Sequence, residues 1–254
     1  AVNTYLIISV LFWYTGLLPD FAVVRDRTKG LRRWVYGVLS LGWAGSHRQW
    51  WHYRNSYVFF AAMVAAVVVS VHSVVSWDFS LSILPGWHAT IFPPYFVAGA
   101  IHSGLAMVLL FLMPTRRLLK LERIIHPEDF ENMTKLMVVT GMIMGYSYIT
   151  EIFVAWYSGN PLEWEIVRYR MAGPFAWAFW PMFIFNALVP RLFFFKRFRI
   201  QETLMMACAL FIVVGMWLER YVIIISSLSH DFIPHAWGGY WPSVVESGIT
   251  FGSF

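Results

Sequence analysis

The chain has 254 residues, of which 59% are hydrophobic and 13% are charged. Soluble domains carry about 25% charged residues, so this composition excludes an ordinary soluble domain and predicts an integral membrane protein. The one cysteine, Cys208, excludes disulfides, cysteine-ligated iron–sulfur clusters and covalently attached haem within the chain. The net charge of +5 is concentrated in alternate loops, a pattern that indicates membrane topology and gives no reason to expect nucleic-acid binding.

Six stretches are long and apolar enough to cross a bilayer, which takes about 20 residues. They are 1–24, 56–77, 95–114, 136–157, 174–195 and 203–226. Backbone groups in lipid must be bonded within the span, and no alternating barrel pattern is present, so we predict an all-α transmembrane bundle with at least six helices. We expect one transmembrane domain, 1–254, that belongs to a longer protein, because both ends of the chain are apolar runs.

Basic residues indicate which loops face inward. Most lysines and arginines lie in three loops, 25–54, 115–135 and 190–202. In contrast, only Arg168 and Arg170 are basic in the other connections, which are 78–94, 158–173 and the tail from 227. Inner loops are enriched in Lys and Arg, so these last three segments are predicted to face outward.

The loops on the two sides differ in character. The first inner loop contains RRWVYGVLSLGW at 32–43, whose apolar spacing next to arginines predicts a short helix in the inner membrane interface. The outer loops at 84–95 and 232–242 are apolar and rich in Trp, Pro and Gly. Part of this content reflects the preference of Trp and Tyr for the interface, and we interpret the rest as a surface that a partner protein covers.

Ionisable side chains in the predicted spans share one depth. With a helical rise of about 1.5 Å per residue, they fall roughly 3–8 Å outward of the middle of their spans. They are His72, His102, Glu151, Glu219 and Arg220, and Asp78 lies at the outer boundary. An ionisable group within the hydrocarbon costs roughly 2–4 kcal/mol, so a functional role is the first hypothesis for this layer.

Three interpretations of the layer are open. In the first, Glu219 or Glu151 pairs with Arg220 and the histidines bond to neighbouring helices, which is a packing role. In the second, His72 and His102 are the axial ligands of a b-type haem. In the third, a carboxylate and an imidazole near the hydrocarbon edge accept the protons of a quinol, while its electrons leave to a nearby centre.

The spacing of polar residues favours quinone chemistry. Ser76 follows His72 by four residues, so the hydroxyl and the imidazole share a helix face. Asp78 lies about 9 Å further along the axis, which suits a proton relay through water. Ser147 and Glu151 form a second pair at the same spacing. Such strings of side chains conduct protons in some proteins and join helices in others.

Small residues and one proline predict how the spans pack. Gly141 and Gly145 form a GxxxG pair, which is typical of close helix approach, and Gly99 and Gly104 are expected to act in the same way. Pro181 is expected to kink the fifth span, and Asn186 to satisfy the backbone groups that the kink frees.

Four stretches carry a resemblance to a known family. They are 12–27, 70–101, 151–161 and 215–225, and the longest begins SVHSVVSWDFSLSILPGWHATIFPP. These stretches resemble ActC, the NrfD-type membrane subunit family of bacterial alternative complex III. The membrane subunit of polysulfide reductase is a more distant relative.

The resemblance implies a multi-pass subunit of the bacterial cytoplasmic membrane, built from two four-helix bundles. It implies oxidation of menaquinol near the outer face, with no metal or haem in this chain. Electrons would pass to an iron–sulfur subunit at the outer face and then to c-type cytochrome subunits. Further implied partners are a homologous membrane subunit and a haem–copper oxidase.

The resemblance also assigns roles to residues. It implies Asp78 as the quinol-site carboxylate and His72 as its proton-relay neighbour, with Ser76 and Trp77 beside them in the quinone site. The proton path would contain Glu151, Glu219, Arg220 and His102, although His102 departs from the family pattern. The family's earlier helices, which carry a histidine of the quinol pocket, are not in this sequence. A non-catalytic scaffold or proton-conducting sister subunit is therefore the alternative.

Overall fold

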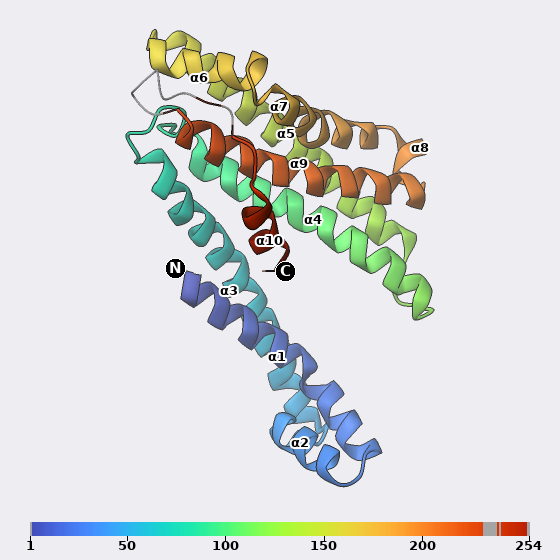
Figure 1. Cartoon of the computed structure of the whole chain (residues 1–254). Helices are drawn as coiled ribbons and strands as arrows, with labels where there is room; N and C mark the ends of the chain where they lie inside the picture. Colours follow the sequence, from blue (N-terminus) through green and yellow to red (C-terminus); the bar gives the residue numbers. More distant parts are fainter. Residues whose placement is uncertain (1, 231–237, 239, 253–254) are drawn as a thin grey trace. The chain divides into compact units, whose positions relative to one another are not determined.

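The computed structural model describes residues 2–230, 238 and 240–252 (Figure 1). This part of the chain is helical and contains no strand. Six elements are long and apolar enough to span a membrane, as predicted. They are α1 (Val2–Arg27), α3 (His47–Ser80), α4 (Phe92–Leu118), α5 (Pro127–Tyr157), the segment Ala176–Phe194 and α9 (Glu202–Leu228). The short helices are α2 (Leu31–Leu39), α6 (Pro161–Ala172), α8 (Lys196–Arg199) and α10 (Val244–Gly252).

The chain forms two compact units, 1–75 and 76–254, with the boundary inside α3. In the first unit, α1 contacts α3 through the rings of Phe12 and Tyr57, whose centroids are 4.8 Å apart. Helix α2 is held to α1 by the Tyr14 hydroxyl, which donates to the Leu39 carbonyl at 2.5 Å. The amphipathic segment predicted in the first inner loop is therefore a helix, as expected.

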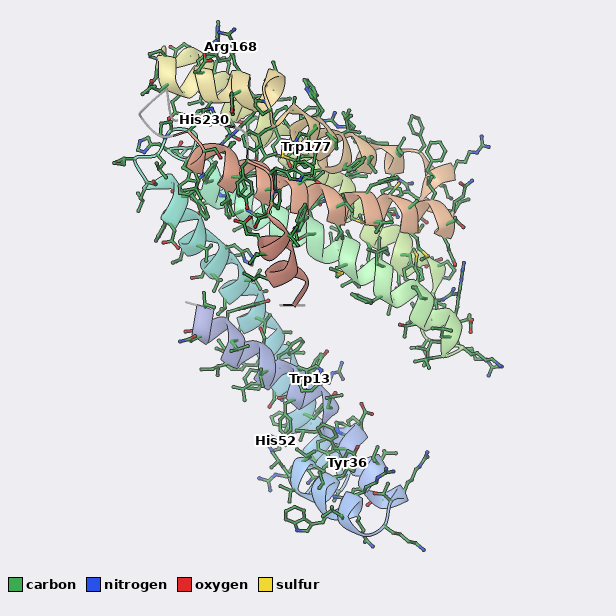
Figure 2. The ribbon with its side chains drawn as sticks, viewed as in Figure 1. Trp13, Tyr36, His52, Arg168, Trp177 and His230 are labelled. Carbon is green, nitrogen blue, oxygen red and sulfur yellow. The ribbon has the colours of Figure 1, made fainter. Side chains whose placement is uncertain are left out.

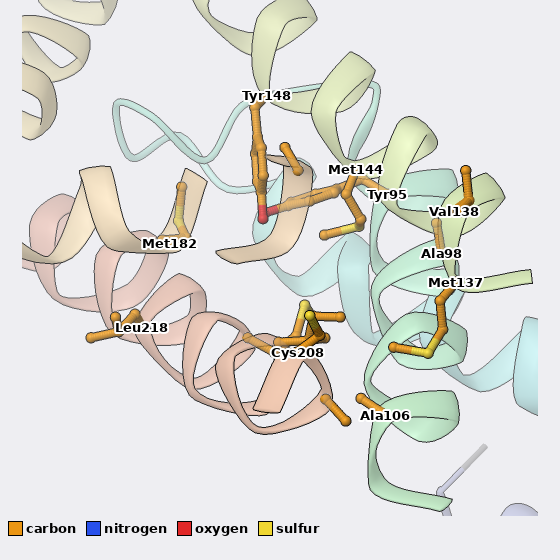
Figure 3. Packing of buried hydrophobic residues seen from close by; sticks show 14 of the residues in the cluster. Tyr95, Ala98, Ala106, Met137, Val138, Met144, Tyr148, Met182, Cys208 and Leu218 are labelled. Atoms are coloured by element: carbon orange, nitrogen blue, oxygen red, sulfur yellow. The ribbon is translucent and has the colours of Figure 1, made fainter. Parts of the chain in front are cut away.

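The second unit is a bundle in which α4 lies beside both α5 and α9, and the segment Ala176–Phe194 closes the other side (Figure 1). Its apolar core is built mostly from Phe, Met, Leu and Ala side chains (Figure 3). The larger members with under 2% exposure include Phe92, Leu109, Met113, Phe130, Met137, Met144, Phe193 and Ile212. Because lipid is as apolar as these side chains, tight packing rather than burial from water holds the helices together.

The GxxxG pair lies where α5 meets the fifth span. A Cβ placed on Gly141 would lie 2.8 Å from Pro190 Cβ, and one on Gly145 would lie 3.2 Å from Ala187 Cβ. The prediction of close helix approach is confirmed for both glycines, and also for Gly99, where a Cβ would lie 2.9 Å from Met216 Cε of α9. It is wrong for Gly104, since no described atom lies within 4 Å of a Cβ built there.

The fifth span is continuous but irregular. Helix α7 (Ala176–Phe183) contains Pro181, and it continues as a π-helical turn, η1 (Ile184–Leu188), and a 3₁₀ turn, η2 (Val189–Phe194). Pro190 has no N–H to donate to the carbonyl of Asn186 four residues earlier, which favours a change of helix type at this point. The break that we predicted at Pro181 therefore lies further along the chain. Asn186 sits in the π-helical turn and its side chain points to other helices.

Candidate functional site

Arg170 is the centre of a polar cluster in the second unit, at the end that is predicted to face outward. Its buried guanidinium donates from Nη1 to Glu151 Oε1 at 2.6 Å, an ion pair between α6 and α5. It also donates from Nε to Ser226 Oγ at 2.7 Å and from Nη2 to Ser227 Oγ at 2.9 Å, both on α9. A buried charge is stable only when it is paired and hydrogen-bonded, and these contacts meet that requirement.

The start of α6 explains why this arginine turns inward. Asn160 caps the helix by accepting a hydrogen bond from the Leu162 N–H at 3.0 Å, and Pro161 occupies the first turn. Two residues on a helix are about 200° apart, so Arg168 and Arg170 lie on opposite faces. Arg168 is exposed on α6 (Figure 2) and has only an ion pair of 3.7 Å with Glu165.

The loop between α3 and α4 is fixed over this cluster at Gly86. The Gly86 N–H donates to Glu163 Oε2 at 3.0 Å, and the Gly86 carbonyl accepts from Arg170 Nη2 at 3.4 Å. The indole N–H of Trp87 donates to the Ile223 carbonyl of α9 at 2.7 Å. Burial raises the pKa of Glu163 above its ordinary value. The loop, α6 and α9 thus form one polar junction.

An outer cavity of about 350 Å³ opens beside this junction. Its apolar lining comes from Ile91, Val154, Ala155 and Val167, and its polar lining includes His88, Thr90, Thr150, Glu151, Ser158, Asn160, Glu163 and Arg170. This size is within the range of ligand pockets. The carboxylate of Glu151 is therefore one partner of the ion pair with Arg170 and also lines a cavity large enough for a small molecule.

A smaller cavity of about 20 Å³ lies on the inner side of the ion pair, lined by Glu151, Arg170, Tyr95 and Tyr148 among others. The rest of its lining is apolar, but a space of this volume with two tyrosines, a carboxylate and a guanidinium on its wall is large enough for one water molecule. The rings of Tyr95 and Tyr148 meet edge to face beyond it, with centroids 5.7 Å apart (Figure 3).

Glu219 is fully buried at the deep end of this arrangement. The Tyr148 hydroxyl donates to Glu219 Oε2 at 2.5 Å, and Asn186 Nδ2 donates to the Tyr148 oxygen at 2.9 Å. Arg220 Nη2 lies 3.7 Å from Glu219 Oε1 and supplies the countercharge. The Arg220 guanidinium is itself placed 4.3 Å from the centroid of the Phe96 ring, in a cation–π contact.

These groups form a line across the outer half of the second unit. We define the polar column as this line of groups. It begins at Glu219, passes through Tyr148 and the small cavity, and ends at Glu151 and the outer cavity. Carboxylate, phenol and water can each accept and release a proton, so the column has the chemistry of a proton path.

A sequence profile of one family, described as polysulphide reductase NrfD, matches residues 4–230. The chain belongs to the NrfD family. A search of the curated proteins found no match. Members of the NrfD family are multi-pass membrane subunits of redox complexes, and membership suggests a subunit of a quinone oxidoreductase-type complex.

The predicted quinone residues of this NrfD chain lie near the end of α3, on both sides of the unit boundary. His72 is half-buried in the first unit, and its Nδ1 bonds to the Val68 carbonyl at 2.8 Å within the same helix. In the second unit, Ser76 is buried, whereas Trp77 and Asp78 are exposed. Asp78 has no hydrogen bond or ion pair with any described residue and lines neither cavity.

The structure brings together some of the predicted proton-path residues and separates others. Glu219 and Arg220 pair, as the packing interpretation expected, but Glu151 pairs with Arg170 instead. The hydroxyl of Ser147 donates to its own helix at the Ile143 carbonyl and does not reach Glu151.

His102 lies apart from the polar column, buried between α4 and α5. Its Nδ1 lies 2.7 Å from Thr140 Oγ1, and Thr140 in turn donates to the Leu136 carbonyl at 3.1 Å. The threonine hydroxyl can therefore accept from a protonated Nδ1. This geometry is that of an interhelical bond.

Four functional candidates of this NrfD chain were missed by sequence reasoning: Tyr148, Glu163, Arg170 and the side chain of Asn186. A signal existed for Arg170. Basic residues are concentrated in the loops predicted to face inward, so an arginine in a loop predicted to face outward is an exception, and an acidic partner near it could have been expected. Tyr148 and Asn186 gave no such signal, because their partner on α9 is distant in the sequence. Most of the apolar outer segment 232–242 lies outside the described residues.

Replacement of Gly86 by Ala is expected to destabilise the protein by about 1–3 kcal/mol. Gly86 has φ +79°, and a Cβ there would lie 2.9 Å from both Arg170 Nη2 and Ile166 Cγ2. Gly159→Ala is the matched control, because Gly159 also has a positive φ of +67° but a Cβ would meet nothing within 4 Å. Thermal unfolding of both variants in detergent measures the difference. Equal losses of stability would contradict the conclusion that Gly86 is packed tightly against Arg170 and Ile166.

Proposed function

We propose that this chain is a membrane subunit of a bacterial menaquinol:acceptor oxidoreductase of the alternative complex III type, seated in the cytoplasmic membrane. The observation that carries the proposal is the polar column, which runs from a buried carboxylate to a cavity at the outer end of an NrfD-type bundle. Oxidation of a quinol releases two protons for every two electrons, so a subunit that oxidises quinol in the membrane needs such a route.

In this proposal, Asp78 and His72 carry the first proton steps. Menaquinol becomes menaquinone by losing two electrons and two protons. The exposed carboxylate of Asp78 accepts a hydrogen bond, and then a proton, from a quinol hydroxyl, with Ser76 and Trp77 beside it. His72 bonds through Nδ1 to a backbone carbonyl, which leaves the lone pair of Nε2 to relay a proton.

The polar column takes the proton role that the resemblance gave to Glu151, Glu219 and Arg220. Arg220 and Arg170 each hold one of the two carboxylates at opposite ends of the column. Tyr148 and one water in the small cavity would connect them. In this proposal, Glu219 receives protons within the membrane and Glu151 releases them to the outer cavity.

The electrons leave through partners, because the proposal places no metal or haem in this chain. An iron–sulfur subunit at the outer face takes them and passes them to c-type cytochrome subunits. A homologous membrane subunit and a haem–copper oxidase complete the proposed assembly. Two apolar side chains just before the outer loop, Leu81 and Ile83, are exposed and support a protein partner at this face, whereas Phe92 and Tyr95 at the end of the loop are buried in the bundle.

A second candidate is a proton-conducting or scaffold subunit that does not oxidise quinol. It is favoured by one observation, namely that Asp78 lines neither the outer nor the small cavity. A b-type haem anchor is the third, and Soret absorption of the purified chain would reveal it.

A photoreactive naphthoquinone tests the proposal in the intact assembly. We expect crosslinks in the peptide that contains Asp78 and Trp77, and we expect excess menaquinol to suppress them. Crosslinks that lie only outside this chain would contradict the proposal and favour the scaffold alternative.

A further inference from the structure

The short helix α2 leaves a complete apolar stripe uncovered. Leu31, Trp34, Val35 and Val38 recur at the spacing of one helix face, and their exposed fractions are 77%, 67%, 39% and 56%. None of the nine residues of α2 is buried. The side that faces α1 is made by Tyr36 (Figure 2), whose ring centroid is 6.0 Å from that of Phe21.

The cations around this stripe lack hydrogen-bond and ion-pair partners within the described part of the chain, and Asp26 acts on Arg33 only at longer range. Arg27, Lys29, Arg32 and Arg33 make no hydrogen bond or ion pair with any described residue. Asp26 is the one acidic residue in 25–54, and its Oδ1 already bonds to Arg25 Nε at 2.8 Å. The positive charge of this surface is therefore suited to binding an anion from outside the chain.

The position of α2 determines which anion can reach it. Only three residues separate α1 from α2, so α2 begins within about 14 Å of the inner end of that span. Two hollows of about 490 and 500 Å³ flank the helix, the first lined by Arg25, Arg33 and Trp34 and the second by Arg32, Thr28 and Tyr36 among others. Each combines a guanidinium with an apolar or aromatic wall.

We propose that α2 is a binding surface for anionic phospholipid on the inner leaflet. The stripe from Leu31 to Val38 lies among the acyl chains, and lipid phosphates occupy the hollows beside Arg32 and Arg33. A helix with an apolar face and flanking arginines is suited to this depth of the membrane. A protein partner would leave the four cations unmatched unless it were strongly acidic, and the charge complementarity therefore favours lipid.

Native mass spectrometry of the full chain in detergent, titrated with phosphatidylglycerol or phosphatidylcholine, tests this proposal. The double variant Arg32→Gln with Arg33→Gln is expected to weaken phosphatidylglycerol binding by about fivefold per charge removed, and to leave phosphatidylcholine binding unchanged. The matched control is Lys196→Gln with Arg197→Gln, two exposed adjacent cations in another inner loop.

A second variant covers the case in which the double variant fails to fold. Trp34→Ala keeps every charge and removes the largest side chain of the stripe, so it is expected to weaken the binding of both lipids. A photoreactive phosphatidylglycerol should crosslink to the peptide 31–39 of the unaltered chain. Equal losses in the two double variants, or crosslinks that avoid this peptide, would overturn the proposal.

Discussion

Replacing Asp78 by Asn is expected to slow electron transfer from quinol to acceptor by about a hundredfold or more in the intact assembly. General acid–base groups contribute factors of roughly 10² to 10⁴, and the amide cannot accept a proton from the quinol hydroxyl. Because Asp78 is exposed and makes no hydrogen bond or ion pair with any described residue, the substitution should not disturb the fold. The rate is measured with a menaquinol analogue and a cytochrome acceptor.

Three controls are needed to interpret the rate of the Asp78 variant. The cytochromes of the variant must remain reducible by another donor, and the subunit content must be normal. Asp20→Asn is the matched substitution, since Asp20 is also an exposed carboxylate on a spanning helix. A rate that is unchanged in the Asp78 variant would move quinol oxidation away from this chain and leave it a conducting or structural role.

Replacing Arg170 by Ala is expected to cost about 3–5 kcal/mol of stability. The change removes the countercharge of the half-buried Glu151, and it leaves the buried hydroxyls of Ser226 and Ser227 without their hydrogen bonds to the guanidinium. It also removes the hydrogen bond to the Gly86 carbonyl. Thermal or denaturant unfolding in detergent measures the loss.

Arg168→Ala is the control for this prediction, because it lies two residues away on the exposed face of the same helix. Its effect should stay within about 0.5 kcal/mol. Arg170→Lys should recover only part of the stability, since one ammonium cannot reach partners on α5, α9 and the loop with the geometry of a guanidinium. Similar stabilities of the Arg168 and Arg170 alanine variants would show that the polar junction does not support the fold.

The fold could be predicted from the sequence because only a few backbone structures can span a membrane. Each of the six apolar stretches corresponds to one spanning element of the structure. The observed helices are mainly longer than the predicted spans; for example, α3 begins at His47, whereas the predicted span begins at 56. The irregular fifth span was placed less well. Pro181 was an obvious breaker, but Pro190 and its packing against Gly141 set the position of the π-helical turn.

The depth of the candidate site was predicted from the sequence, but of its ion pairs only that of Glu219 with Arg220 was. Glu151 and Glu219 were placed in the outer half of the membrane from helical rise alone, and the polar column contains both. Their partners depend on how each helix is rotated in the bundle, which a single sequence does not encode in any simple pattern. The pairing of Glu151 with Arg170 joins residues 19 apart across a turn and a second helix, so hydropathy could not reveal it.

The most direct test of the account measures electron transfer and outward proton release together, in the assembly reconstituted into vesicles, with Glu219 replaced by Gln. Glutamine keeps an oxygen for the Tyr148 hydroxyl but cannot carry a proton, so the column should keep its shape and lose its function. Glu165→Gln, an exposed carboxylate on α6, is the control. We predict that proton release slows by about tenfold or more and that turnover slows with it. Proton release and turnover at the rates of the unaltered assembly would contradict the account.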